Sequence, residues 1–223
     1  MLLETAVLLL AAGDHLAWQK QFPDSPRKQL HVINPPGETV IARIIRQCED
    51  RGAAPIVISH IPEIIAESKG RHFAPSIWCR GLTCLTLLST MGLWKERTII
   101  LLGDVIFGKE AMDLVFAWEE NYGNFGDYWE TYGISFVKSQ WLRVVQTIVK
   151  TNELARNGQQ GSLVFMWKVW CDSPFHGKKP MDKPEWIHFH DWTMDIDLPG
   201  QWKNFNIGIV DKGRLNDLPE EQE

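Results

Sequence analysis

The chain has 223 residues, of which 44% are hydrophobic and 23% charged, proportions that are typical of a soluble globular protein. Its formal net charge of −5 argues against a nucleic-acid-binding protein that works through a basic surface. The apolar N-terminus lacks a preceding cationic segment and no other long apolar run follows, so we expect no membrane association and a cytoplasmic protein. We expect a single domain over residues 1–217, followed by an acidic tail over 218–223.

The apolar run Thr5–Ala12 predicts a strand that is buried on both faces. It stops at Gly13, and a glycine directly after a buried strand lets a ligand approach the backbone closely. The polar segment that follows carries Lys20, Arg27 and Lys28. Backbone amides together with cations suit a phosphate group, although many α/β proteins also begin with a buried strand and a glycine turn that bind nothing.

Strand and helix patterns alternate along the next part of the chain. Val40–Cys48 has helical spacing and Pro55–Ser59 reads as a second strand, so the first three elements form a βαβ unit with a parallel sheet. Further strands are predicted around Phe73–Cys79 and over Arg97–Leu102, Thr131–Val137 and Glu185–Asp191. Helices are predicted over Pro62–Lys69, Gly81–Leu93, Lys109–Asn121, Ser139–Ala155 and Ser162–Trp170, an irregular loop over Tyr122–Trp129, and a terminal helix that begins around Met194.

Two acidic segments are candidates for a metal site. Arg97–Leu102 runs directly into Asp104, and the carboxyl ends of parallel strands are where open α/β sheets bind ligands. Asp195 and Asp197 share one strand face and can point at the same cation. Each aspartate could instead cap a helix. His188 and His190 also share a face, but no third zinc ligand accompanies them, so satisfied histidines in a sheet are favoured.

Four segments together resemble the signature of the nucleotidyltransferases that couple sugar phosphates, alditol phosphates or molybdopterin to a nucleotide. They are LLLAAG ending at Gly13, Lys28-Gln29-Leu30, LLGDVIF around Asp104, and Asp-Ile-Asp-Leu-Pro from Asp195. The resemblance implies a GT-A-type fold: a three-layer α/β/α sandwich with a mostly parallel, mixed central sheet. It also implies a Mg²⁺-dependent transfer of a nucleotide from a nucleoside triphosphate to a phosphorylated acceptor.

The resemblance also assigns roles to residues. In that family the first loop wraps the triphosphate, the lysine neutralises its phosphates, a later helix N-terminus lies against the nucleotide, and aspartates bind the metal. These roles fall here on Ala11, Ala12, Gly13, Arg27 and Lys28 for the triphosphate, on Arg80, Gly81 and Thr83 for the helix, on Asp104, Asp195 and Asp197 for Mg²⁺, and on Lys28 and Asp104 for catalysis.

Two departures from the signature keep other functions open. His15 stands where the family has its second glycine, and Ala17 stands where it has a phosphate-binding arginine. Lys20 or Arg27 could supply that missing charge; otherwise the chain would be a nucleotidyltransferase-like binding protein without catalysis. A glycosyltransferase that uses a nucleotide sugar is a third possibility, although it would usually have Asp-x-Asp where this chain has Gly103-Asp104-Val105.

Overall fold

The computed structural model describes residues 4–12, 16–33, 37–76, 83–127, 130–156, 161–174, 179–191 and 193–195. Seven strands form a central sheet in the order β10-β8-β9-β6-β1-β4-β5. β9 is antiparallel to its neighbours β6 and β8, and every other pair in this sheet is parallel. The strands are β1 (Thr5–Leu10), β4 (Ile56–Ile58), β5 (His72–Phe73), β6 (Arg97–Leu102), β8 (Tyr122–Gly126), β9 (Thr131–Val137) and β10 (Trp186–His188).

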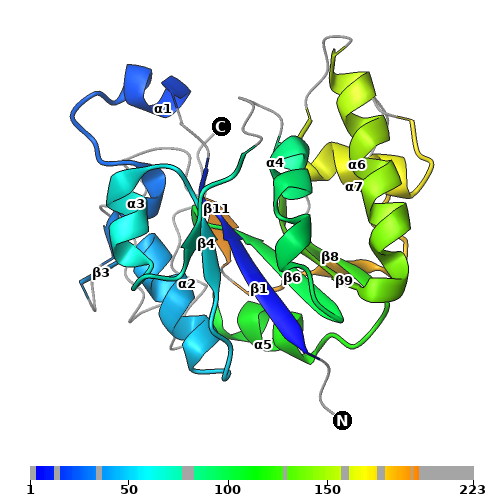
Figure 1. Ribbon diagram of the computed structural model, residues 1–223, viewed down its shortest axis with the longest axis horizontal. Helices are drawn as coiled ribbons and strands as arrows, with labels where there is room; N and C mark the ends of the chain where they lie inside the picture. The colour runs from blue at the N-terminus through cyan, green and yellow to red at the C-terminus, as the bar shows by residue number, and fades with distance from the viewer. Residues whose placement is uncertain are drawn as a thin grey trace, which may run out of the picture.

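Helices cover both faces of this sheet, which gives three layers (Figure 1). One face carries α2 (Val40–Glu49), α3 (Pro62–Glu67) and α5 (Lys109–Ala117), and the other carries α4 (Thr83–Ser89), α6 (Trp141–Arg156) and α7 (Leu163–Trp170). The α/β sandwich with a mostly parallel, mixed sheet is therefore confirmed. The shorter elements are α1 (Leu16–Gln21), the 3₁₀ turns Lys28–Leu30, Met91–Leu93 and Lys138–Gln140, and the two-stranded pairs β2 (Val32–Ile33) with β3 (Glu38–Thr39) and β7 (Val105–Ile106) with β11 (Met194–Asp195).

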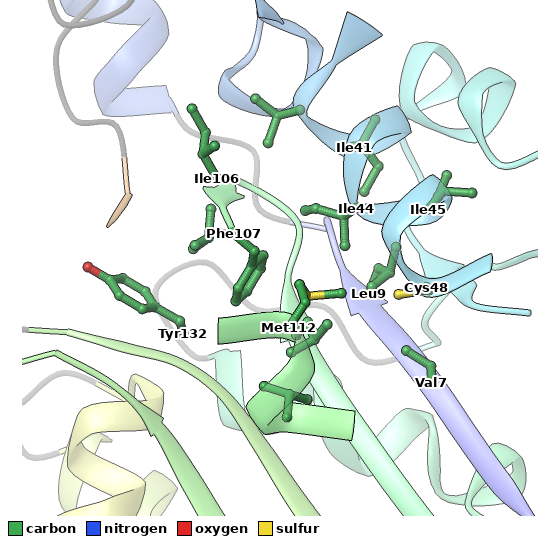
Figure 2. Packing of buried hydrophobic residues seen from close by; sticks show 14 of the residues in the cluster. Val7, Leu9, Ile41, Ile44, Ile45, Cys48, Ile106, Phe107, Met112 and Tyr132 are labelled. Carbon is green, nitrogen blue, oxygen red and sulfur yellow. The ribbon is translucent and has the colours of Figure 1, made fainter. Parts of the chain in front are cut away.

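The first strand lies at the centre of the molecule because its side chains are apolar on both faces. Val7 and Leu9 pack against α2, where Figure 2 shows them beside Ile41, Ile44 and Cys48. The side chains that alternate with them belong to the hydrophobic cluster under α4, α6 and α7. A continuous apolar run is what a strand covered on both faces requires. Within the described ranges, no helix combines the length and the apolar composition that a membrane span needs.

The loop expected over Tyr122–Trp129 is wrong for its first five residues. Tyr122–Gly126 is the fully buried strand β8, which pairs with β9 on one side and β10 on the other. Its glycines suggest a loop, but here they make room for packing. A Cβ added to Gly123 would lie 2.5 Å from Trp118 Nε1, and one added to Gly126 would overlap the backbone of Glu130.

Gly123→Ala should therefore destabilise the fold by about 1–3 kcal/mol, since the new methyl group must displace the Trp118 ring. Urea unfolding of the full chain measures this change. Gly92→Ala is the matched control, because nothing lies within 4 Å of the Cβ that it would add, and it should change the free energy of unfolding by less than about 0.5 kcal/mol. Equal stability of the two variants would contradict this account of β8.

Candidate functional site

The carboxyl ends of the parallel strands meet along one edge of the sheet. Leu10 at the end of β1 pairs with Leu102 at the end of β6, and Gly126 at the end of β8 pairs with His188 at the end of β10. The chain leaves β1 toward β4 on one side and later forms β6 on the other, so the strand order reverses beside β1. Such a reversal at the carboxyl edge is where open α/β sheets bind ligands.

The first two residues beyond β1 are tightly packed. Ala11 and Ala12 are buried, and the Ala11 amide donates to Ile58 O at 3.0 Å while its carbonyl accepts from Ser59 Oγ at 3.0 Å. A Cβ on Gly103 would lie 2.9 Å from the Ala11 Cβ. The Ala11 amide is thus engaged by the sheet, and the position requires a small side chain for packing.

Lys28 lies in a 3₁₀ turn that packs against α2 and α3. Its side chain is only 8% exposed, and its ammonium lies 5.7 Å from the centroid of the Trp18 ring. Trp18 is itself buried and donates from Nε1 to Pro26 O at 3.0 Å. The hydrogen bond to Pro26 fixes the Trp18 ring, and the face of this ring attracts the Lys28 ammonium and so helps to hold it in place. Sequence reasoning missed Trp18, whose signal is a tryptophan in an otherwise polar segment.

The two other cations of this segment differ in exposure. Lys20 lies on the surface at the end of α1, whereas Arg27 is half-buried directly before Lys28. Of the two candidates for the missing arginine, Arg27 is therefore the one that lies beside Lys28.

The main chain of Asp195 lies next to the turn that carries Asp104. Asp104 is half-buried between β6 and β7, and β11 pairs antiparallel with β7 so that Asp195 lies opposite Val105. Paired strands are about 4.8 Å apart, so segments separated by about ninety residues in sequence become neighbours here. The terminal helix expected from Met194 is wrong for its first two residues, because Met194–Asp195 forms β11; the remainder of that helix lies outside the described residues. β11 pairs with β7 and not with the central sheet.

A set of hydrogen bonds fastens the segment before β11 to the start of α5. Asp191 accepts from Ala111 N at 2.9 Å and from Thr193 N at 3.0 Å, and Thr193 Oγ1 accepts from Gly108 N at 2.8 Å. These side-chain oxygens accept hydrogen bonds from main-chain amides at the start of α5. The N-cap of α5 is Gly108, which has no side chain that could accept them. A Cβ on Gly108 would overlap the Asp191 carboxylate. Sequence reasoning missed Asp191; the one signal was a helix start without Ser, Thr, Asp or Asn.

Several expected site residues fall outside what the structure describes. Gly13, Arg80, Gly81 and Asp197 lie outside the described residues, as do the side chains of Thr83 and Asp195. Among the described side chains, no three of histidine, cysteine, aspartate or glutamate come together as a metal site. The predicted Mg²⁺ ligands therefore stay a prediction, supported by the pairing of the two backbones that carry Asp104 and Asp195.

Asp191→Ala should lower the free energy of unfolding by about 1–3 kcal/mol, because the amides of Ala111 and Thr193 lose their acceptor. Asp182→Ala removes an exposed carboxylate of the preceding loop and should change it by less than about 0.5 kcal/mol. Urea unfolding measures both, and hydrogen exchange at Ala111 locates the effect. If the Ala111 amide is equally protected in both variants, Asp191 does not hold these segments together.

No protein-family model matches the chain, and no curated protein matches it. Solved structures that are similar to this chain include the following two. The 4-diphosphocytidyl-2C-methyl-D-erythritol synthase of Anaerococcus prevotii matches with a TM-score of 0.53 and 11% identity, over 93% of this chain and 96% of that one. A protein of Bacillus anthracis assigned as a glucose-1-phosphate thymidylyltransferase, in complex with sucrose, matches with a TM-score of 0.52 and 11% identity, over 86% of this chain and 89% of that one.

At 11% identity these likenesses establish the fold and nothing finer. They cover the central sheet and both helical layers, since they extend over most of this chain and of each similar structure. The chain has the α/β fold of the nucleotide-diphospho-sugar transferases.

Proposed function

We propose that this chain is a Mg²⁺-dependent nucleotidyltransferase that joins the nucleotide of a nucleoside triphosphate to a sugar phosphate or a similar phosphorylated acceptor. The observation that carries this proposal is the pairing of Asp195 with Val105, which supports a common site for Asp195 and Asp104 at the carboxyl edge of the sheet. The two similar transferases share that fold, and the buried Lys28 lies in the segment that follows β1.

The reaction needs alignment and charge neutralisation more than it needs reactive side chains. An oxygen of the acceptor phosphate attacks the α-phosphorus of the triphosphate, the bond from that phosphorus to the bridging oxygen breaks, and pyrophosphate leaves with the electron pair. A bound Mg²⁺ supplies positive charge to the reacting oxygens, and it prefers carboxylate ligands such as Asp104, Asp195 and Asp197.

The cations of the N-terminal segment would bind the triphosphate. Lys28 supplies one positive charge, and Trp18 limits the directions in which its ammonium can move. Arg27, directly before it, is positioned to supply the charge that Ala17 does not. The role of this pair is to hold the leaving pyrophosphate in line with the attacking oxygen.

A nucleotide-binding protein without transfer activity is the second candidate. It is favoured by Ala17, which stands where the resembled family has a phosphate-binding arginine. A thermal-shift panel of five nucleoside triphosphates and the matching nucleotide sugars, with and without Mg²⁺, followed by a pyrophosphate-release assay with sugar 1-phosphates, separates the candidates. Stabilisation with release supports the transferase, stabilisation without release supports the binding protein, and a preference for nucleotide sugars supports a glycosyltransferase.

Lys28→Ala should raise the dissociation constant of the best-binding triphosphate by roughly tenfold or more, a loss of ~1.4 kcal/mol, because a buried ammonium no longer contacts phosphate. Lys150→Ala removes an exposed lysine from α6 and should leave that constant unchanged. Isothermal titration with the nucleotide measures both. Unchanged affinity in the Lys28 variant would show that this lysine is structural.

Asp104→Asn should abolish Mg²⁺-dependent release of pyrophosphate and weaken Mg²⁺ binding, because an amide cannot replace the charge of a carboxylate ligand. Stability without metal should be unchanged or higher, since the substitution removes a negative charge from the turn next to the strand that carries Asp195. Asp24→Asn, at an exposed position, is the control and should behave as the unmodified chain. Full Mg²⁺ affinity in Asp104→Asn would exclude Asp104 as a ligand.

A further inference from the structure

A second group of ionisable side chains lies at the same edge of the sheet, beyond β8 and β10. Asp127 directly follows β8, His188 ends β10, and Lys179 lies over the Trp186 ring at 4.1 Å from its centroid. The register places the ends of β6, β8 and β10 in nearly the same row. β8 is two strands from β6 and β10 is three, so this group lies about 10–14 Å from the end of β6.

Lys179 carries a positive charge that its hydrogen bonds do not neutralise. Its Nζ donates to two main-chain carbonyls, Asp127 O at 2.6 Å and Glu130 O at 3.4 Å. The carboxylate of Asp127 is engaged elsewhere, accepting from Tyr132 Oη at 2.7 Å and from Glu130 N at 2.7 Å. The lysine thus closes the turn between β8 and β9 through hydrogen bonds to neutral carbonyls, and the carboxylates of Asp127 and Glu130 also act on its charge.

Other charges act on Lys179. One of them is Lys168, in the last turn of α7, which is 9% exposed. Burial lowers the pKa of Lys179 to about 8; Asp127 and Glu130 act to raise this pKa, and Lys168 acts to lower it further. His188 faces the same region, and burial, His190 and Lys179 lower its pKa while Asp127 raises it. A partly buried ammonium whose hydrogen bonds go to neutral carbonyls can gain a further charged partner, and an anion would raise its lowered pKa again.

We propose that Lys179 binds a second anionic group on the acceptor, separate from the phosphate that attacks the nucleotide. This inference rests on the proposed function. The attacking phosphate must lie at the Asp104 turn, and a site about 10–14 Å along the edge is too far to hold the same phosphate. The acceptor is therefore acidic at both ends: a phosphorylated sugar or polyol whose body carries a carboxylate or a further phosphate.

Matched acceptors test this inference in the full chain without nucleotide. Isothermal titration compares glucose 1-phosphate, which has a neutral body, with glucuronic acid 1-phosphate and glucose 1,6-bisphosphate. We expect at least one of the two acidic-bodied compounds to bind about tenfold or more tightly at pH 7. Which of the two binds more tightly distinguishes a carboxylate from a phosphate as the second anion. Equal affinity for all three compounds overturns the inference.

Lys179→Met should reduce that discrimination to less than about twofold, since it keeps an apolar stem over Trp186 and removes the charge. Lys179→Arg should keep it, and Lys183→Ala, at an exposed position of the same loop, is the control. Discrimination that persists in Lys179→Met overturns the inference, and so does its loss in Lys183→Ala. The stabilisation of the protein by triphosphate, measured by thermal shift, should be the same in all variants. A failure of nucleotide binding, which would count against the proposed function, is therefore seen separately.

The pH dependence of this discrimination separates a lysine that binds the anion from one that is purely structural. Because the protonated amine binds the anion, discrimination should fall as the pH rises above about 8, the pKa of Lys179. Anion binding itself raises this pKa, so the fall begins at or above that value. Lys179→Arg should keep its discrimination up to pH 10, because a guanidinium stays protonated there. Discrimination that rises with pH, or that falls equally in Lys179→Arg, contradicts the role of Lys179.

Discussion

The close approach of β1 and β6 at their carboxyl ends determines the geometry of the rest of the site. The Gly103 amide donates to Leu10 O at 2.9 Å. A Cβ added to Gly103 would lie 2.9 Å from the Ala11 Cβ and 3.3 Å from Ile41 Cδ1 of α2, so this position has no room for a side chain. Because this contact joins the two strands at their last residues, the chain must turn directly afterwards. Asp104 occupies that turn, and β7 leaves the sheet with an edge that β11 can pair.

Long-range hydrogen bonds then supply what local structure cannot. β11 is a ladder of two residues, and a pair of such short strands is marginal without further packing. Asp191 and Thr193 stabilise this short pair of strands, because their side chains accept hydrogen bonds from amides at the start of α5. The position of Asp195 therefore depends on α5, and α5 has no acceptor of its own at Gly108.

Most of the fold was predictable because its strands and helices have strong periodicity. Thr5–Leu10 and Arg97–Leu102 each end in a run of consecutive apolar residues, and α2 shows one apolar face, so all three were found with nearly correct bounds. β8 was missed because its glycines serve contacts with Trp118 and Glu130, which only the tertiary structure reveals. The Asp104 turn follows from a strand pattern, whereas Asp191 and Trp18 act through partners that no local spacing identifies.

The distribution of charge along the edge suggests why a transferase would need both halves of this sheet. Lys28 lies in the segment after β1, the Asp104 turn follows β6, and Lys179 lies beyond β8 and β10, so cation, carboxylate and cation follow one another across the strands. A metal at the carboxylates would offset most of their negative charge, so that a substrate carrying negative charge along its length would meet less repulsion there. Because Asp191 and Thr193 join the segment before β11 to the start of α5, any ligand that binds more tightly when β11 is paired must also stabilise the start of α5. Binding of the proposed substrate at this edge would therefore be coupled to the stability of that helix start, even though α5 lies on the face of the sheet opposite α7.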